Sequence, residues 1–164
     1  MKTVFPDDKK IDNPSRLILT IYTGPEHFSF SLHDPNEEDS FIYNELTGEG
    51  QTDGFSILKE AFLDNTFFSL PFRKVIIMYR TPAFTFIPIS LYEEESKGNF
   101  FQFQFPDKQG IILNDVISNT GISVIYQLPE EFYHLVLRLF AKPVFIHYSS
   151  PIITFFFGEN PKYK

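Results

Sequence analysis

The residues best placed for phosphate chemistry lie in a short turn, Thr23-Gly24-Pro25-Glu26, between two alternating apolar runs. The whole stretch, "LILTIYTGPEHFSFSL", is typical of a β-hairpin near the start of a domain. A glycine in such a turn lets backbone N–H groups approach a phosphate. Thr23 and Gly24 are therefore the candidate cofactor-binding residues of this chain.

The neighbouring residues of the turn oppose phosphate binding. Pro25 removes one backbone N–H from the set that would hold a phosphate, and Glu26 places a negative charge where a polyanion would bind. A plain type I or type II turn, with Gly-Pro setting the backbone, is the favoured interpretation.

No other group of residues predicts a catalytic or metal site. The chain has no cysteine and no Gly-x-Ser-x-Gly motif, and its 4 histidines include no pair at the i, i+4 spacing of helical metal ligands. We expect His33, beside Asp34, to end a strand and His134 to be solvated. His147 is expected to be a hydrogen-bonded structural residue. The sequence thus predicts neither catalytic residues nor a bound metal.

The composition fits one globular domain with an aromatic core. The 164 residues include 21 Phe and 8 Tyr, with 43% hydrophobic and 21% charged residues overall. The net charge of −7, with acidic clusters at residues 37–39 and 93–95, argues against nucleic acid as a partner. No apolar run has the length of a membrane span or a signal peptide, so we expect a cytoplasmic protein.

The order of the expected elements defines the fold class. Three strands at residues 16–22, 28–33 and 40–46 are predicted to form an antiparallel meander. A helix beginning near Asp53 then leads to a buried, parallel strand at residues 73–80. This order predicts an α/β fold with a mixed sheet, as at the opening of ribonuclease-H-like domains, a sheet that actin-like ATPases use twice.

The second part of the chain contains an expected insertion. Residues 81–127 are predicted to form a small inserted subdomain of strands and one short helix. Within it, "FFQFQF" alternates in a way that favours a strand, either packed on the subdomain core or exposed at an edge. Apolar spacing predicts a helix at residues 130–140 and a strand at 144–148. The following stretch, "SSPIITFFF", is compatible with a helix or a strand.

The two ends of the chain carry separate expectations. Residues 1–15 are expected to form a flexible N-terminal arm, which leaves residues 16–164 as a half-domain with its insertion. No closing helix or cap follows the last apolar run, so we expect that Lys164 marks a cut rather than a natural end. The triplet Phe155-Phe156-Phe157 would then expose surface that a second half covers.

Four stretches give the sequence a family resemblance: "SRLILTIYTGPEHFSFSLHD", "KVIIMYRTPAFTFIPISLYEE", "ILNDVISNTGISVIYQLPEEFYHLVLRLF" and "PVFIHYSSPII". They cover most of residues 15–153 and resemble the uncharacterised bacterial family DUF3822, whose members are similar to actin-like ATPase domains. Members of that family are longer than this chain and are built of two related halves. The resemblance implies that this sequence is the first half, and that the other half would supply the second wall of any nucleotide cleft.

The resemblance allows two hydrolytic interpretations to be tested on residues. In actin-like ATPases the first hairpin carries an Asp that holds a magnesium-bound water, but residues 17–27 contain no Asp. A ribonuclease-H-like nuclease needs several converging carboxylates for two metal ions. The strands at residues 16–22 and 73–80 carry no acid, which leaves Glu60 of the first helix alone. We therefore do not expect a hydrolase or a nuclease.

The function that these observations favour is a non-catalytic interaction or scaffold protein with a degenerate actin-like fold, whose partner is another protein. Under this hypothesis no cofactor is expected. The alternative is a switch protein that binds ATP with magnesium through Thr23 and Gly24 but lacks the hydrolytic Asp. The sequence favours no particular oligomeric state.

Overall fold

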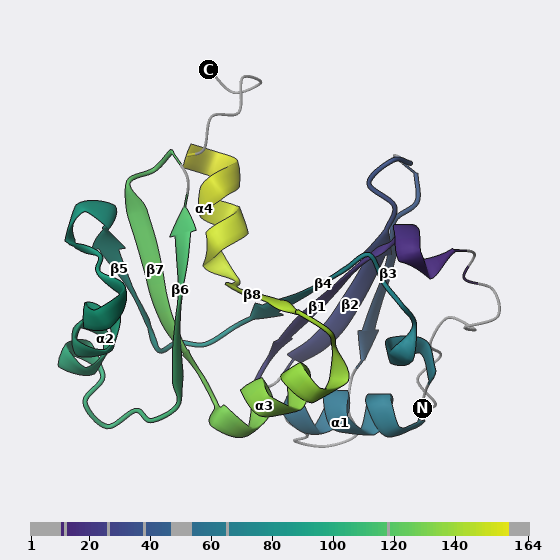
Figure 1. The fold of residues 1–164 in the computed structure, drawn as a ribbon, viewed down its shortest axis with the longest axis horizontal. Coiled ribbons are helices and arrows are strands. Elements are labelled where there is room, and N and C mark those ends of the chain that lie inside the picture. Colours follow the sequence, from purple (N-terminus) through teal and green to yellow (C-terminus); the bar gives the residue numbers. More distant parts are fainter. Residues whose placement is uncertain are drawn as a thin grey trace. The chain divides into compact units, whose positions relative to one another are not determined.

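The computed structural model describes Ile11 and residues 13–25, 27–37, 39–46, 54–64, 66–117 and 119–157. The chain divides into two compact units, which are labelled by element in Figure 1. The first unit comprises Met1–Met78 and His134–Phe145, and the second comprises Tyr79–Tyr133 and Ile146–Lys164. Most of the expected arm lies outside the described residues, and its last part, with Arg16, forms the 3-10 turn Pro14–Arg16.

A five-stranded sheet forms the centre of the first unit. The strand order is β3-β2-β1-β4-β8, so β4 takes the interior position that its apolar sequence predicts. The expected meander is confirmed, because β2 pairs antiparallel with both β1 and β3. The strands are β1 (Ile18–Gly24), β2 (His27–His33), β3 (Ile42–Leu46), β4 (Lys74–Tyr79) and β8 (Val144–His147).

Alternation along the first two strands creates the core of this unit. Leu19 lies opposite Leu32 and Ile21 lies opposite Phe30, and all four side chains are fully buried. Helix α1 (Gly54–Asp64) contacts both strands, as the predicted helix requires. The 3-10 turn η3 (Thr66–Ser69) adds two buried rings, Phe67 and Phe68, which pack against Phe30 with ring centroids 5.2 Å and 5.8 Å away.

The predicted helix near residue 130 is also confirmed. Helix α3 (Glu130–Leu139) begins with two acidic residues and has Arg138 in its last turn, which suits the helix dipole. Phe132, Val136 and Phe140, spaced four residues apart, are all buried.

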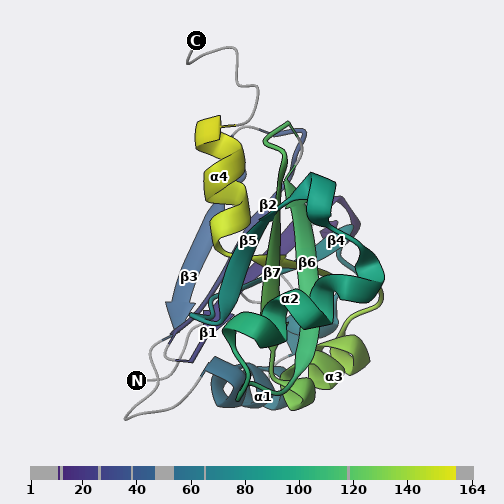
Figure 2. The same ribbon diagram turned by 90° about the vertical axis from the view of Figure 1, so that its left-hand side faces the viewer.

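A three-stranded antiparallel sheet forms the second unit. Its order is β5-β7-β6, so the central strand β7 is buried along most of its length. Figure 2 shows helix α2 crossing one face of this sheet, and α2 contacts all three strands. The elements are β5 (Phe84–Pro88), η4 (Ile89–Leu91), η5 (Glu94–Ser96), α2 (Lys97–Gln104), β6 (Ile111–Ile117), β7 (Ile122–Leu128) and α4 (Ser149–Phe157).

The prediction of a strand at "FFQFQF" is wrong, because all but the last of these residues belong to helix α2, and Phe105 is its C-cap. A strand would place Phe101, Phe103 and Phe105 on one face, whereas Phe101 is fully buried and Phe103 is 93% exposed. Helical spacing instead brings Phe101 and Phe105 together, with ring centroids 5.0 Å apart. Phe101 fills a core cluster with Ala83, Ile87 and Ile125. Packing against this cluster therefore overrides the local alternation.

Candidate interaction surface on helix α4

Helix α4 presents a group of large apolar side chains to solvent. Ile152 is 50% exposed and Phe155 is 51% exposed, while Phe156 and Phe157 are 71% and 73% exposed. Ile152, Phe155 and Phe156 follow the i, i+3, i+4 spacing that places side chains on one side of a helix. We call these four residues the α4 surface.

The first turn of α4 explains why this segment is helical rather than extended. Pro151 lies there, where its missing N–H does not interrupt the helical hydrogen bonds. Ser150 is buried, and its carbonyl oxygen accepts a hydrogen bond from Thr154 Oγ1 at 2.9 Å. The alternative that the sequence leaves open at residues 149–157 is thus decided in favour of the helix.

A half-buried carboxylate fixes the start of α4 to the three-stranded sheet. Asp115 of β6 accepts a hydrogen bond from Ser150 Oγ and another from the backbone N–H of His147, at 2.6 Å, both through Oδ2. Its Oδ1 accepts from the hydroxyl of Tyr126, on β7, at 3.2 Å. A carboxylate near the first turn of a helix also interacts favourably with the helix dipole. We call this group of residues, with His147 included, the Asp115 cluster.

Burial dominates the electrostatics of Asp115. Desolvation raises the pKa of the carboxyl above its usual value, although the hydrogen bonds from Ser150, His147 and Tyr126 act in the opposite direction. The same burial, together with the negative charge of Asp115, raises the pKa of the Tyr126 hydroxyl. The Tyr126 hydroxyl therefore keeps its proton and donates a hydrogen bond to Asp115.

His147 is completely buried and makes a hydrogen bond through each ring nitrogen. Nε2 lies 3.2 Å from the carbonyl oxygen of Thr81, and Nδ1 lies 2.7 Å from Ser149 Oγ. Because a carbonyl can only accept, Nε2 carries the proton and Nδ1 accepts from Ser149. Desolvation lowers the pKa of His147 to about 4, so the ring is neutral at pH 7. The ring is hydrogen-bonded, as the sequence predicts.

The hairpin residues Thr23 and Gly24 end β1 and are both buried. Gly24 pairs with His27 at the end of the hairpin. The Thr23 side chain is 1% exposed, and within the described residues its Oγ1 is a buried side-chain oxygen without a hydrogen-bond partner. An orphaned buried hydroxyl is uncommon in folded proteins.

Three side chains near this hairpin form a chain of contacts, from Ser29 through His27 to Glu45. His27 Nε2 lies 3.0 Å from Ser29 Oγ, and His27 Nδ1 lies 3.4 Å from a carboxylate oxygen of Glu45. A hydroxyl, an imidazole and a carboxylate that contact one another in this order are the groups of a catalytic triad. Ser29, however, is completely buried, while Glu45 is half exposed. The hydroxyl is thus enclosed in the sheet, and the arrangement joins β2 to β3 instead of presenting a nucleophile.

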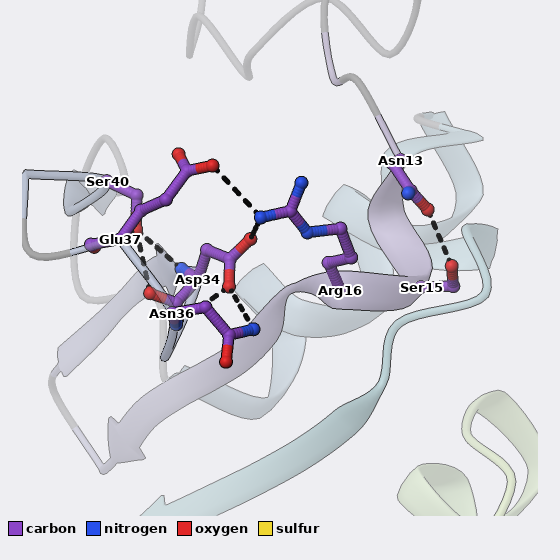
Figure 3. A network of polar contacts seen from close by, with 7 residues as sticks. All are labelled: Asn13, Ser15, Arg16, Asp34, Asn36, Glu37 and Ser40. Atoms are coloured by element: carbon purple, nitrogen blue, oxygen red, sulfur yellow. Dashed lines mark hydrogen bonds and ion pairs between the residues drawn. The ribbon is translucent and has the colours of Figure 1, made fainter.

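A second carboxylate network lies at the other end of the same strands. Arg16 binds Asp34 at 2.8 Å and Glu37 at 2.9 Å, and Figure 3 shows its guanidinium between the two carboxylates. Asp34 Oδ1 accepts from both the backbone N–H and the side-chain amide of Asn36, each at 2.9 Å. The backbone N–H of Asp34 in turn donates to Ser40 Oγ at 2.6 Å. The network closes the loop between β2 and β3.

The residues that form the Asp115 cluster and the Asp34 network are different from the sequence candidates Thr23 and Gly24. Sequence reasoning missed Asp115 and Tyr126, which lie in two different strands. Their signal was only an acid, preceded by Asn114, inside a mostly apolar strand run at residues 111–117. Of the described residues, no three His, Cys, Asp or Glu side chains gather as a metal site would require. No helix in the described ranges is long and apolar enough to cross a membrane.

Comparison with solved structures defines the fold. A Bacteroides thetaiotaomicron protein described as having an actin-like ATPase fold and unknown function matches with a TM-score of 0.78 and 24% sequence identity. The match covers 93% of this chain but only 59% of the Bacteroides chain. The cytoplasmic domain of EpsL, an inner membrane component of the type II secretion system of Vibrio cholerae, matches at 11% identity with a TM-score of 0.41. That match covers 75% of this chain and 49% of the EpsL domain.

The chain therefore has an α/β, actin-like ATPase fold, as predicted from the order of its elements. It belongs to the family of proteins of unknown function DUF3822, whose pattern matches residues 6–162. A comparison with curated proteins finds no match.

Proposed function

We propose that this protein is a non-catalytic interaction or scaffold protein that binds a protein partner through the α4 surface. The observation that carries the proposal is the exposure of Ile152, Phe155, Phe156 and Phe157 on a helix whose first turn is fixed by the Asp115 cluster. Apolar side chains gathered on one rigid element are typical of a protein interface. A fixed helix also loses little conformational freedom when a partner binds.

The coverage of the Bacteroides structure supports one kind of partner. This chain spans 59% of the Bacteroides chain, so that protein contains a further polypeptide part without a counterpart here. We propose that a domain of that kind covers the α4 surface, whether it is supplied within one polypeptide or by a separate one. The family resemblance, which implies two related halves, points in the same direction.

Site-specific photo-crosslinking in cells of the source organism tests this proposal. A photoreactive benzoylphenylalanine replaces Phe156 in one version of the protein and Phe103 in the other. Phe103 is the matched control, because it is an exposed phenylalanine on a helix of the same unit. We expect a defined protein adduct from position 156 and none from position 103. Equal adducts at both positions, or none at 156, would contradict the proposal.

A second candidate function, nucleotide binding, rests on the orphaned hydroxyl of Thr23. Because Thr23 is 1% exposed, a nucleotide could become the partner of this oxygen only if the hairpin moves, and Gly24 would give the backbone the freedom to do so. The cofactor would be ATP with magnesium, held without the hydrolytic Asp of actin-like ATPases.

A thermal melt with and without millimolar magnesium-ATP tests the second candidate. A ligand at 100 times its Kd adds about 2.7 kcal/mol, which raises the Tm of a chain this size by roughly 5–10 °C. Thr23→Val should abolish that shift and should stabilise the free protein by about 1 kcal/mol, since it removes the unpaired hydroxyl. An unchanged Tm in the wild type would eliminate nucleotide binding and leave the hairpin as a plain turn.

The interaction proposal includes a cytoplasmic location in a bacterial cell. Fractionation of the source organism, with detection of the protein by antibody, would test this location directly. Recovery of the protein outside the cytoplasmic fraction would contradict this location.

A further inference from the structure

Strand β3 forms the outer edge of the five-stranded sheet. It pairs along one side with β2, from Ile42 opposite Leu32 to Leu46 opposite Phe28. In the described part of the chain, no strand pairs with its other side. Such an edge leaves alternate backbone N–H and C=O groups available to a further strand.

The side chains at this edge do not prevent strand addition. Phe41, Ile42 and Tyr43 are 63%, 45% and 54% exposed. Because consecutive residues of a strand point to opposite faces, apolar surface flanks the edge on both sides of the sheet. The sequence of β3 contains no Lys and no Pro, two residues with which natural proteins block open edges.

The charges around β3 have a single sign. Every charged residue from Asp34 to Leu58 is acidic. Glu37, Asp39 and Glu45 are exposed, and Arg16 neutralises only the first of them by direct contact. An approaching segment that carries Lys or Arg is therefore attracted, whereas an acidic one is repelled. A second copy of this chain would bring the same acidic residues and is disfavoured for that reason.

We propose that β3 binds an extended segment of a partner protein, with alternating apolar and basic residues, as an additional strand of the sheet. Backbone hydrogen bonds along the open side of β3 would provide affinity. On one face of the sheet, Ile42 would cover the apolar residues of the segment. On the opposite face, Glu45 would attract its basic residues, and Tyr43 would pack against their aliphatic stems. This surface is independent of the α4 surface and lies in the other unit.

The probe for a binding experiment is a short fluorescein-labelled peptide of alternating lysine and valine, measured by fluorescence anisotropy against the intact protein. Wild-type protein should bind it, and Tyr43→Lys should weaken binding at least about tenfold, because it removes apolar surface and reverses the local charge. Phe103→Lys, an equal change at an exposed aromatic of α2, should leave the affinity unchanged. Circular dichroism confirms that each variant is folded.

Two altered peptides separate strand addition from simple charge attraction. A peptide with glutamate in place of lysine should not bind. A lysine-valine peptide N-methylated at every residue keeps its charge but cannot donate a backbone hydrogen bond along either edge, and its binding should fall at least about tenfold. Equal binding of the methylated peptide, or no binding of the original one, would overturn the proposal.

Light scattering after size-exclusion chromatography tests whether a second copy of this chain, instead of a partner segment, pairs with β3. A dimer of the wild type that becomes a monomer in Tyr43→Lys would assign the edge to a second copy and overturn the proposal. Phe156→Ser, on the α4 surface, should leave peptide binding unchanged. Failure of peptide binding would thus concern β3 alone and would not bear on the partner of α4.

Discussion

The two carboxylate networks of the molecule use similar hydrogen bonds but have opposite electrostatics. Asp34 accepts from the backbone N–H of Asn36, and Asp115 accepts from the backbone N–H of His147. The pKa of Asp34 is lowered, chiefly by the Asn36 N–H and further by the Asn36 amide and the Arg16 and Arg73 guanidinium groups, while burial opposes these effects. The pKa of Asp115 is raised, because desolvation outweighs its three hydrogen bonds.

The difference lies in the charge that each network contains. Asp34 has the guanidinium of Arg16 at 2.8 Å, so its ionised form is neutralised locally. Asp115 has only neutral donors, the hydroxyls of Ser150 and Tyr126 and a backbone N–H. The Asp115 carboxylate is thus held in place by hydrogen bonds from neutral groups. We infer that the first network closes a loop, whereas the second is the main polar fastening of helix α4.

Removal of Asp115 should therefore have the largest effect on stability. Asp115→Ala leaves the buried donors of Ser150, Tyr126 and His147 without an acceptor, and we expect a loss of about 2–4 kcal/mol. Urea denaturation measures the change in the free energy of unfolding.

The comparison needs two further variants. Asp34→Ala should destabilise the protein less than Asp115→Ala does. Asp107→Ala, at an exposed loop position, should stay within about 0.5 kcal/mol of the wild type. If Asp34→Ala proved the more damaging of the first two, the roles assigned to the networks would be reversed.

The pH dependence of stability should show the neutral state of His147. Its pKa is about 4 in the folded chain and near 6.5 when unfolded, so the unfolded state binds a proton first as the pH falls. Stability should consequently decrease between pH 6.5 and pH 4, by on the order of 2–3 kcal/mol, and this contribution should be constant above pH 7. Chemical denaturation across this range measures it.

A matched pair of histidine variants isolates this effect. His147→Gln should lose the acid-dependent decrease, although it lowers stability at pH 7. His134→Gln, at an exposed position of α3, should retain the wild-type profile. A wild-type profile that is unchanged by His147→Gln would show that His147 does not titrate in this range.

The first network could be predicted from the sequence more readily than the second, for a physical reason. A two-residue connection between Gly24 and His27 fixes the register of the β1–β2 hairpin, which pairs Ile18 with His33. Arg16 and Asp34 flank that pair and could have been placed together from the sequence. The Asp115 cluster joins Asp115 to residues 32 and 35 positions further along the chain. No local pattern fixes such a pairing.

The same distinction explains the two segments that were hardest to predict. The strand predicted at "FFQFQF" rested on alternation, but burial of Phe101 among Ala83, Ile87 and Ile125 selects the helix. The segment that became α4 has residues suited to a strand, and its helix start depends on Asp115 from another element. Elements with a clear internal period, such as α3 and the meander, needed no such partner and were predicted correctly.

The smallest effect, and the most direct test of the comparison, is the titration of the two carboxyl groups. The carbon chemical shift of each carboxyl, followed by NMR, should titrate below the usual 3.8 for Asp34 and above it for Asp115. The stability that Asp34 contributes is then present above its unfolded pKa and is lost as the pH falls through the lowered value. The stability linked to Asp115 is instead lost as the pH rises through its raised value. Added salt should weaken the effect of Arg16, whose side chain is about half exposed, on the pKa of Asp34. Salt should leave Asp115 nearly unchanged, because its hydrogen bonds come from neutral donors. Arg16→Gln should raise the pKa of Asp34 without affecting Asp115, and a joint shift of both would refute the separation of the two networks.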